Sequence, residues 1–202
     1  MGLLGRFRRK EERAVPAGFA PEAVADSILH PSSFSLVVFH DDHAGQVPAL
    51  LAACGYTVLH TGHVHGNPVQ LHDALGEVRD GSIVTKAYWS CPTMTVLIDP
   101  EMIVSSASEE QLAAFCRDQE TKAVCAVWER VSETAMLIEI DADGVRRKTW
   151  HERGAHVEAS DPRPEVAASP DDAGLKAGLA ATGIDTDLLF SEAEATVVEL
   201  QE

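Results

Sequence analysis

The chain has few aromatic and few basic residues. Aromatic side chains make up 5% of its 202 residues, and 16 lysines and arginines face 32 aspartates and glutamates, for a formal net charge of −16. Lysine and arginine supply most of the affinity of proteins for the nucleic-acid backbone, so this balance excludes nucleic acid as the expected partner. The acidic chain is instead expected to bind a protein partner with a basic surface.

Long apolar runs and secretion signals are also missing. No stretch approaches the roughly 18 to 20 apolar residues that a membrane-spanning helix needs. Residues 1–13 are basic but lack the apolar core of a secretory signal, and the four cysteines form no C-x-x-C pair, so we expect a cytoplasmic protein without a transmembrane segment. The leucines and phenylalanine of residues 1–13 allow weak peripheral contact with an anionic membrane.

Glycine-rich phosphate-binding motifs are absent as well. The glycines fit neither G-x-G-x-x-G nor G-x-x-x-x-G-K-[ST], so no nucleotide cofactor is indicated. The first expectation is therefore a protein with no cofactor.

Strand and helix signals alternate along the chain. The apolar run 34–39 is typical of a central strand buried on both faces, and a helix at 47–53 and a strand at 56–59 follow it. Residues 135–140 and 145–150 flank a glycine-containing turn and predict an antiparallel hairpin. We therefore expect an α/β (mixed α+β) fold: a single mixed sheet that begins with a βαβ unit, ends in an antiparallel hairpin and has helices packed on it.

Composition also predicts the domain organisation. Residues 1–20 are expected to be a flexible basic tail, and residues 21–202 a single α/β domain with a Pro-rich surface connection at 158–170. Ser169 is the predicted N-cap of the helix after that connection. The basic cluster Arg146–Lys148, on the second arm of the hairpin, is expected to protect a sheet edge.

Histidines are concentrated behind the first two predicted strands. Side chains two positions apart in an extended chain point the same way, so Asp41 with His43, and His63 with His65, form two candidate ligand pairs. If the two strands are parallel neighbours, both pairs meet at one edge of the sheet. Carboxylate and imidazole ligands suit Zn or Mn.

Two fragments in this region resemble the calcineurin-like metallophosphoesterases. The strand followed by Asp41-Asp42-His43 is similar to the D-x-H motif that opens that family, and Gly62-His63-Val64-His65 is similar to its closing G-H-x-H motif. The resemblance implies a metal-dependent phosphoesterase site. It covers about a tenth of the chain, and the family's intermediate motifs, G-D-x-x-D and G-N-H-[DE], do not occur, so it assigns no family.

Two functions follow as hypotheses. The first is a non-catalytic cytoplasmic binding protein, immunity- or antitoxin-like, for which the sequence assigns no partner-binding residue and in which the histidines are solvated hydrogen-bonding groups. The alternative is a divalent-metal-dependent hydrolase, in which Asp41, His43, His63 and His65 hold the ion and an ion-bound water attacks the substrate. A pH-sensing or acid/base role for the histidines also remains open. No catalytic residue is assigned beyond this ligand set.

Overall fold

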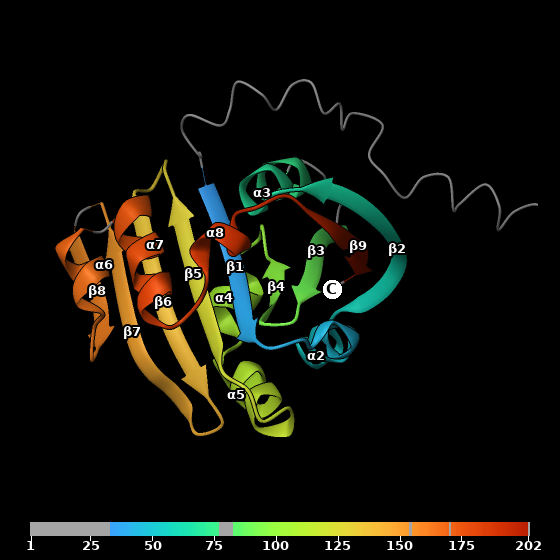
Figure 1. The fold of residues 1–202 in the computed structure, drawn as a ribbon, viewed down its shortest axis with the longest axis horizontal. Helices are drawn as coiled ribbons and strands as arrows, with labels where there is room; N and C mark the ends of the chain where they lie inside the picture. The colour runs from blue at the N-terminus through green and yellow to red at the C-terminus, as the bar shows by residue number, and fades with distance from the viewer. Residues whose placement is uncertain (1–32, 77–82, 154, 170, 202) are drawn as a thin grey trace, which may run out of the picture.

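One antiparallel sheet organises the described part of the chain (Figure 1). The computed structural model describes residues 33–76, 83–153, 155–169 and 171–201. Within them nine strands pair, each antiparallel to its neighbours. From one edge to the other the order is β2 (Thr57–Gly66), β9 (Ala193–Gln201), β3 (Ile83–Cys91), β4 (Met94–Ile98), β1 (Ser33–His40), β5 (Ala123–Glu129), β6 (Thr134–Asp141), β7 (Gly144–Glu152) and β8 (Ala155–Ser160).

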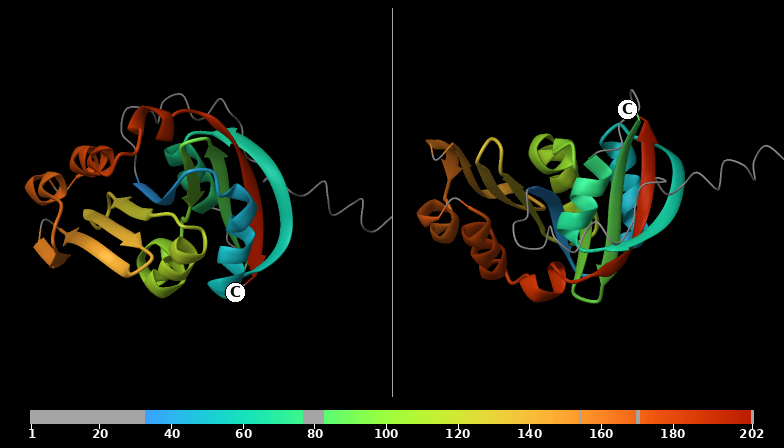
Figure 2. Two further views of the ribbon diagram at one scale, coloured as in Figure 1. Left: turned by 60° about the horizontal axis from the view of Figure 1, so that its bottom comes forward. Right: turned by 90° about the horizontal axis from the view of Figure 1, so that it is seen from above.

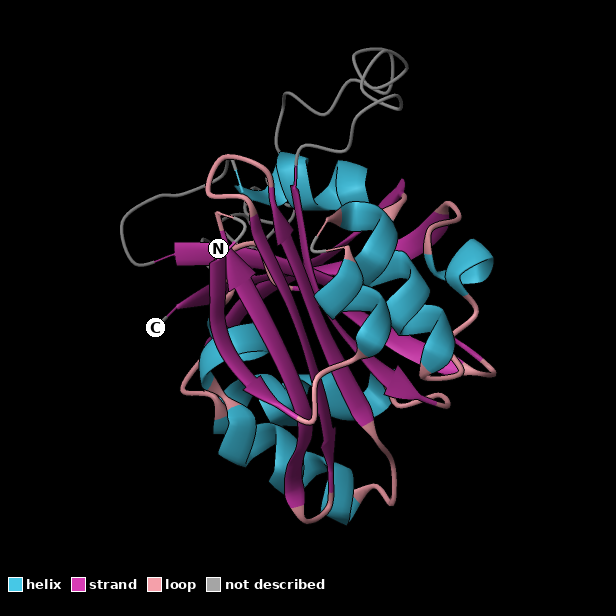
Figure 3. Cartoon of the chain, turned by 90° about the vertical axis from the view of Figure 1, so that its left-hand side faces the viewer, coloured by secondary structure: helices cyan, strands magenta, loops and turns pink. Residues whose placement is uncertain are grey.

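Helices cover both faces of this sheet (Figures 2 and 3). One face packs against α2 (Val47–Ala53), α4 (Ile103–Ala107) and α5 (Glu109–Asp118). The other packs against α3 (Pro68–Gly76), α6 (Pro164–Ala168), α7 (Asp172–Ala181) and α8 (Thr186–Leu189). The predicted α/β class, with one sheet and helices packed on it, is confirmed. None of the described helices has the length and apolar character needed to span a membrane.

Strand β1 lies in the middle of the sheet, as its apolar run predicted. Successive side chains of a strand point to opposite faces. Leu36 and Val38 therefore enter the core beneath α3 and α7, whereas Val37 and Phe39 enter the core beneath α2 and α5. All four side chains are completely buried, so β1 joins the two cores.

The strand–helix–strand order at the start of the fold is present, but its two strands are not neighbours. Strands β1 and β2 run in the same direction, and β4, β3 and β9 lie between them. The expected side-by-side pairing does not form, because strands later in the chain take the places beside both: β4 and β5 next to β1, and β9 next to β2. Strand β2 is also longer than predicted, since it continues through the histidines to Gly66.

The predicted hairpin is confirmed as β6 and β7, but the sheet continues beyond it. Residues 155–160 form β8, which pairs with β7, and residues 164–168 form α6, so the stretch 158–170, expected as a surface connection, contains the end of a strand and a short helix. Strand β8 pairs with β7 only from Lys148 to Glu152, so Arg146 and Arg147 lie where no described strand borders β7 on that side, as expected for a sheet edge, whereas Lys148 does not. The side chains of the cluster also form ion pairs, with Asp141, Asp161 and Glu109 among the acceptors. The tail predicted at 1–20, and residues 21–32, lie outside the described residues.

Helix α7 begins two residues later than predicted. Its N-cap is Asp171 rather than Ser169, because the Asp171 carboxylate accepts a hydrogen bond from the Gly174 amide at 2.9 Å. That hydrogen bond, followed by weaker contributions that include the Ser169 hydroxyl, lowers the pKa of Asp171.

Removing this cap should destabilise the protein modestly. We expect Asp171→Ala to lower the free energy of unfolding by about 1 kcal/mol at pH 7. Because the folded-state pKa is lowered, the stabilisation is present above the ordinary aspartate pKa of about 3.9 and is lost as pH falls through the folded-state value. Thermal melts should therefore show a difference between variant and native protein that shrinks below about pH 4. Glu133→Ala, at an exposed turn without a helix cap, is the control; an equal loss there would contradict the capping role.

Candidate functional site

The four predicted metal ligands do not come together. Asp41 and His43 lie just beyond the end of β1, whereas His63 and His65 lie within β2, four strand positions across the sheet. At about 4.8 Å per strand this separation is about 19 Å along the sheet. In the described ranges, no group of three or more His, Cys, Asp or Glu side chains could hold a metal ion. The hydrolase hypothesis therefore loses the ligand set on which it depends.

The turn after β1 is built around Thr95 rather than around a ligand. The Thr95 hydroxyl donates to the Asp41 carbonyl at 3.0 Å and accepts from the His43 amide at 2.6 Å, while Asp41 takes a left-handed conformation with φ of 68°. The His43 ring stands edge-on to Phe115, 6.1 Å between ring centroids. His43 thus packs against α5 instead of facing the Asp41 carboxylate as a paired ligand.

The two β2 histidines lie on the open surface of the sheet. His63 and His65 are exposed, and they pair in register with Thr196 and Glu194 of β9. The nearest described acid to His65 is Glu192, 3.9 Å from its Nδ1 atom. Two histidines on the sheet surface and one carboxylate beside His65 do not form a metal-binding site.

A buried charged network lies between β3, β4 and α4, and the sequence interpretation missed it. Lys86 is completely buried, and its ammonium group donates to Asp99 and, at 2.6 Å, to Glu101. The second carboxylate oxygen of Asp99 accepts from the amide and hydroxyl of Ser105, at 2.7 and 2.9 Å. The Ser105 hydroxyl in turn lies 2.8 Å from that of Ser35 on β1. The sequence did contain a signal for this network, namely a lysine within the largely apolar stretch 83–89.

The charges of this network are paired within it. Burial opposes the charge of Lys86, but attraction from Asp99 and Glu101 outweighs it and raises the pKa of the ammonium group. The Lys86 ammonium also lies 5.0 Å from the centre of the Tyr56 ring. Lys86, Asp99 and Glu101 line none of the three surface hollows that are described in the next paragraphs. The network ties α4 to the sheet.

A hollow of about 550 Å³ opens where β1 ends, next to the β6–β7 turn. His40 lines this hollow. It also lines a narrower extension of about 190 Å³, which runs along the sheet toward Arg163. Burial lowers the pKa of His40, nearby Lys122 lowers it further, and Asp41 partly offsets both effects. His40 is therefore held toward its neutral form. Arg163 is occupied by two hydrogen bonds to Glu139, at 2.5 and 2.7 Å.

A groove of about 400 Å³ lies between α2 and α5. Its floor is formed by the buried side chains of Leu50 and Phe115, and its walls carry the small side chains of Ala49, Ala53 and Ala114. Small side chains leave room for larger apolar groups of a partner. Helix α2 contributes no charged residue to this groove, so its charges come from α5 alone.

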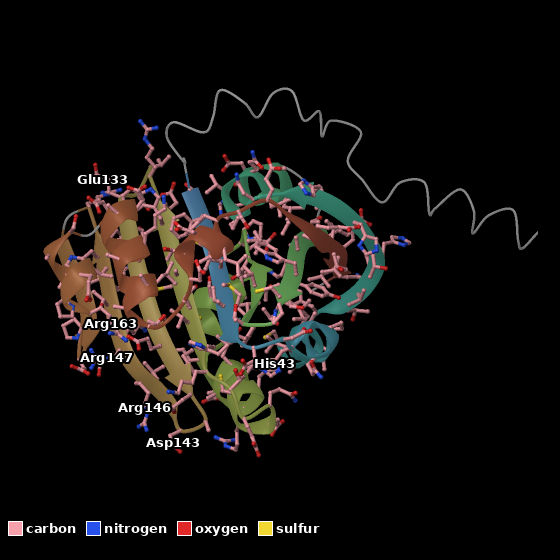
Figure 4. The ribbon with its side chains drawn as sticks, in the orientation of Figure 1. His43, Glu133, Asp143, Arg146, Arg147 and Arg163 are labelled. Carbon is pink, nitrogen blue, oxygen red and sulfur yellow. The ribbon has the colours of Figure 1, made fainter. Side chains whose placement is uncertain are left out.

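Carboxylates gather around these two hollows, at the end of the molecule where His43 and Asp143 are labelled in Figure 4. The hollow at the end of β1 and the α2–α5 groove are together lined by six carboxylates and a single lysine. Arg146 pairs with Asp141 and Asp143, at 2.5 and 3.3 Å. The other four acids are exposed and form no ion pair with any described cation. We call these four the acidic end: Asp41, Glu110, Asp118 and Glu120.

Two members of the acidic end lie where a helix disfavours them. Asp118 is the last residue of α5, and Glu120 follows two positions later. The C-terminus of a helix carries partial negative charge, so a nearby carboxylate costs up to about 1 kcal/mol. Arg117 is the one basic residue of α5, and its guanidinium group donates to the Ala142 carbonyl at 2.7 Å. The two carboxylates therefore outnumber the one cation of the helix at this end.

Sequence reasoning identified the overall acidity but not this location. The four carboxylates come from the loop after β1, from both ends of α5 and from the turn after it, and only the fold brings them together.

Comparison with known proteins adds nothing, since no family model, no curated protein and no solved structure matches the chain.

Proposed function

We propose that this protein is a non-catalytic binding protein that engages a basic protein partner through the acidic end. The observation that carries the proposal is the apolar α2–α5 groove bordered by carboxylates that form no ion pair with any described cation. An immunity- or antitoxin-like role, in which an acidic protein covers a basic toxin, is one function with this chemistry.

The groove and the charges suit complementary parts of one ligand. Leu50 and Phe115 offer an apolar floor, and the alanine walls leave space for large aliphatic or aromatic side chains. Glu110 and Asp118 stand at the two ends of α5, about 12 Å apart at 1.5 Å per residue. An amphipathic helix with apolar side chains on one face and lysines or arginines beside them fits this arrangement.

The position of Asp118 and Glu120 supports a binding role independently. Residues that oppose a helix dipole lower stability, and such costs are commonly retained where function requires the charge. The carboxylates also attract a basic partner over distance, which raises the association rate at low salt.

The experiment measures binding of a fluorescent amphipathic peptide of leucine and lysine. Native protein should bind it, and affinity should fall as salt rises from about 0.05 to about 0.3 M. Reversing two charges in Asp118→Lys/Glu120→Lys should weaken binding at least about tenfold, the equivalent of about 1.4 kcal/mol. Because lysine suits a helix C-terminus, the double variant should melt no lower than the native protein.

Glu133→Lys is the control, with half the change in net charge of the double variant. Glu133 is exposed, has φ of 50° against 52° for Glu120, and lies at the opposite end of the molecule from Asp143 (Figure 4). Its reversal changes net charge without changing the acidic end, so affinity should stay within about twofold of native. Equal losses in the control and in Asp118→Lys/Glu120→Lys would reduce the effect to net charge and contradict the proposal.

A further inference from the structure

Strand β2 forms one border of the sheet, and its outer edge is open among the residues that the structure describes. It pairs with β9 on one side only, and Figures 1 and 2 show it as the outermost strand on its side of the sheet. It spans ten residues, about twice the usual strand length. Its backbone N–H and C=O groups on that side form a ready template for another strand.

This edge carries few of the features by which proteins block strand addition. Edge strands are commonly protected by charged side chains, proline or β-bulges, and β2 has only the irregularity between Val58 and His60. Residues 43–72 contain no Asp, Glu, Lys or Arg, although charged residues make up 24% of the chain, and β2 lies entirely within this stretch. Val58 and Leu59 are exposed by 39% and 37%, two of the few large apolar side chains on the described surface.

We propose that β2 pairs antiparallel with β2 of a second copy of this chain. A two-fold axis makes the added strand antiparallel, which continues the alternation of a sheet in which every described pair is antiparallel. Each copy carries a net charge of −16, so two copies repel each other where their acidic surfaces meet. The uncharged β2 edge lets them meet without like charges face to face.

The register follows from the regular part of the strand. Pairing with β9 shifts between Val58 and His60 and then runs without interruption from His60 to Gly66. The midpoint of these seven residues is His63. A symmetric pairing that uses all seven places His63 opposite the partner's His63, and places Thr61 opposite the partner's His65.

Sedimentation equilibrium tests the pairing. The native chain should have the mass of two copies, and Thr61→Lys/His63→Lys should shift it to one copy by placing charges along the edge. Val131→Lys is the control: this residue is 92% exposed at the β5–β6 turn, and its substitution should leave the dimer intact. Thermal melts establish that each variant folds. A native chain that sediments as a monomer, or a dimer that the two lysines leave intact, would overturn the proposal.

Oxidative cross-linking tests the register. His63→Cys should form a disulfide-linked dimer, because directly opposed residues have Cα atoms about 4.5–5.5 Å apart. His65→Cys should not, since two such residues would be offset by four positions, about 13 Å. The native chain, with its own four cysteines, is the baseline. Equal cross-linking of both variants would contradict pairing centred on His63.

This inference does not depend on the proposed function, and salt separates the two. Screening of like charges should strengthen the dimer as ionic strength rises, whereas it weakens binding of the basic peptide. A monomeric protein that binds the peptide overturns only the dimer. A dimer that ignores the peptide overturns only the proposed function.

Discussion

Replacing Lys86 by methionine should lower the free energy of unfolding by about 3–5 kcal/mol. Methionine fills much of the space of the lysine but leaves Asp99 and Glu101 without their buried cation. Uncompensated buried charge is the costly result of breaking such a network. At about 2–4 °C per kcal/mol for a chain of this size, the melting temperature should fall by roughly 6–20 °C.

Two further variants separate charge from packing. Lys122→Met removes an exposed lysine and should change stability by no more than about 0.5 kcal/mol. Adding Asp99→Asn and Glu101→Gln to Lys86→Met should recover part of the loss, because no unpaired charge then remains buried. If Lys86→Met alone melts within about 2 °C of the native protein, the network does not hold α4 to the sheet as we describe.

The substitution Gly174→Ala should also destabilise the protein strongly, by about 3 kcal/mol. Alanine normally stabilises a helix by about 1 kcal/mol relative to glycine, and Gly174 lies inside α7. Here, however, a Cβ atom would lie 1.7 Å from the Ser169 carbonyl oxygen and 3.0 Å from that of Glu165. Because both carbonyl oxygens belong to the backbone, α6 and α7 must move apart to admit the methyl group.

Gly45→Ala provides the comparison for this effect. A Cβ atom at Gly45 would have no other atom within 4 Å, so its substitution should leave the melting temperature nearly unchanged. Thermal melts of the two variants therefore isolate the contact between α6 and α7. A Gly174→Ala protein that melts as high as the native protein would show that α7 does not pack this closely.

Local sequence signals predicted where strands and helices form better than which strands pair with each other. The apolar run of β1 and the turn between β6 and β7 depend on nearby residues, and both were predicted correctly. The place of β2 depends instead on β9, more than a hundred residues away. No local pattern encodes such a pairing. The strand itself was cut short because its glycines and histidines lack the β-branched character by which strands are identified.

The same distinction explains the candidate site. Spacing correctly paired His63 with His65 on one side of an extended strand, but it could not say that Asp41 and His43 lie four strand positions away. The acidic end depends on α5 lying beside both α2 and the β6–β7 turn, and that arrangement is set by the packing of Leu50 and Phe115 in the core. The overall charge predicted the chemistry of the partner, but not where it binds.

Mapping the leucine–lysine peptide onto the isotopically labelled protein by NMR tests the proposed function most directly. We predict chemical-shift changes concentrated in α2 and α5, in the segment from Asp118 to Lys122 and in the β6–β7 turn. These changes should disappear in Asp118→Lys/Glu120→Lys and persist in Glu133→Lys. Shift changes that spread evenly over the acidic surface, or that centre on the end of the molecule near Glu133, would contradict a binding site at the acidic end.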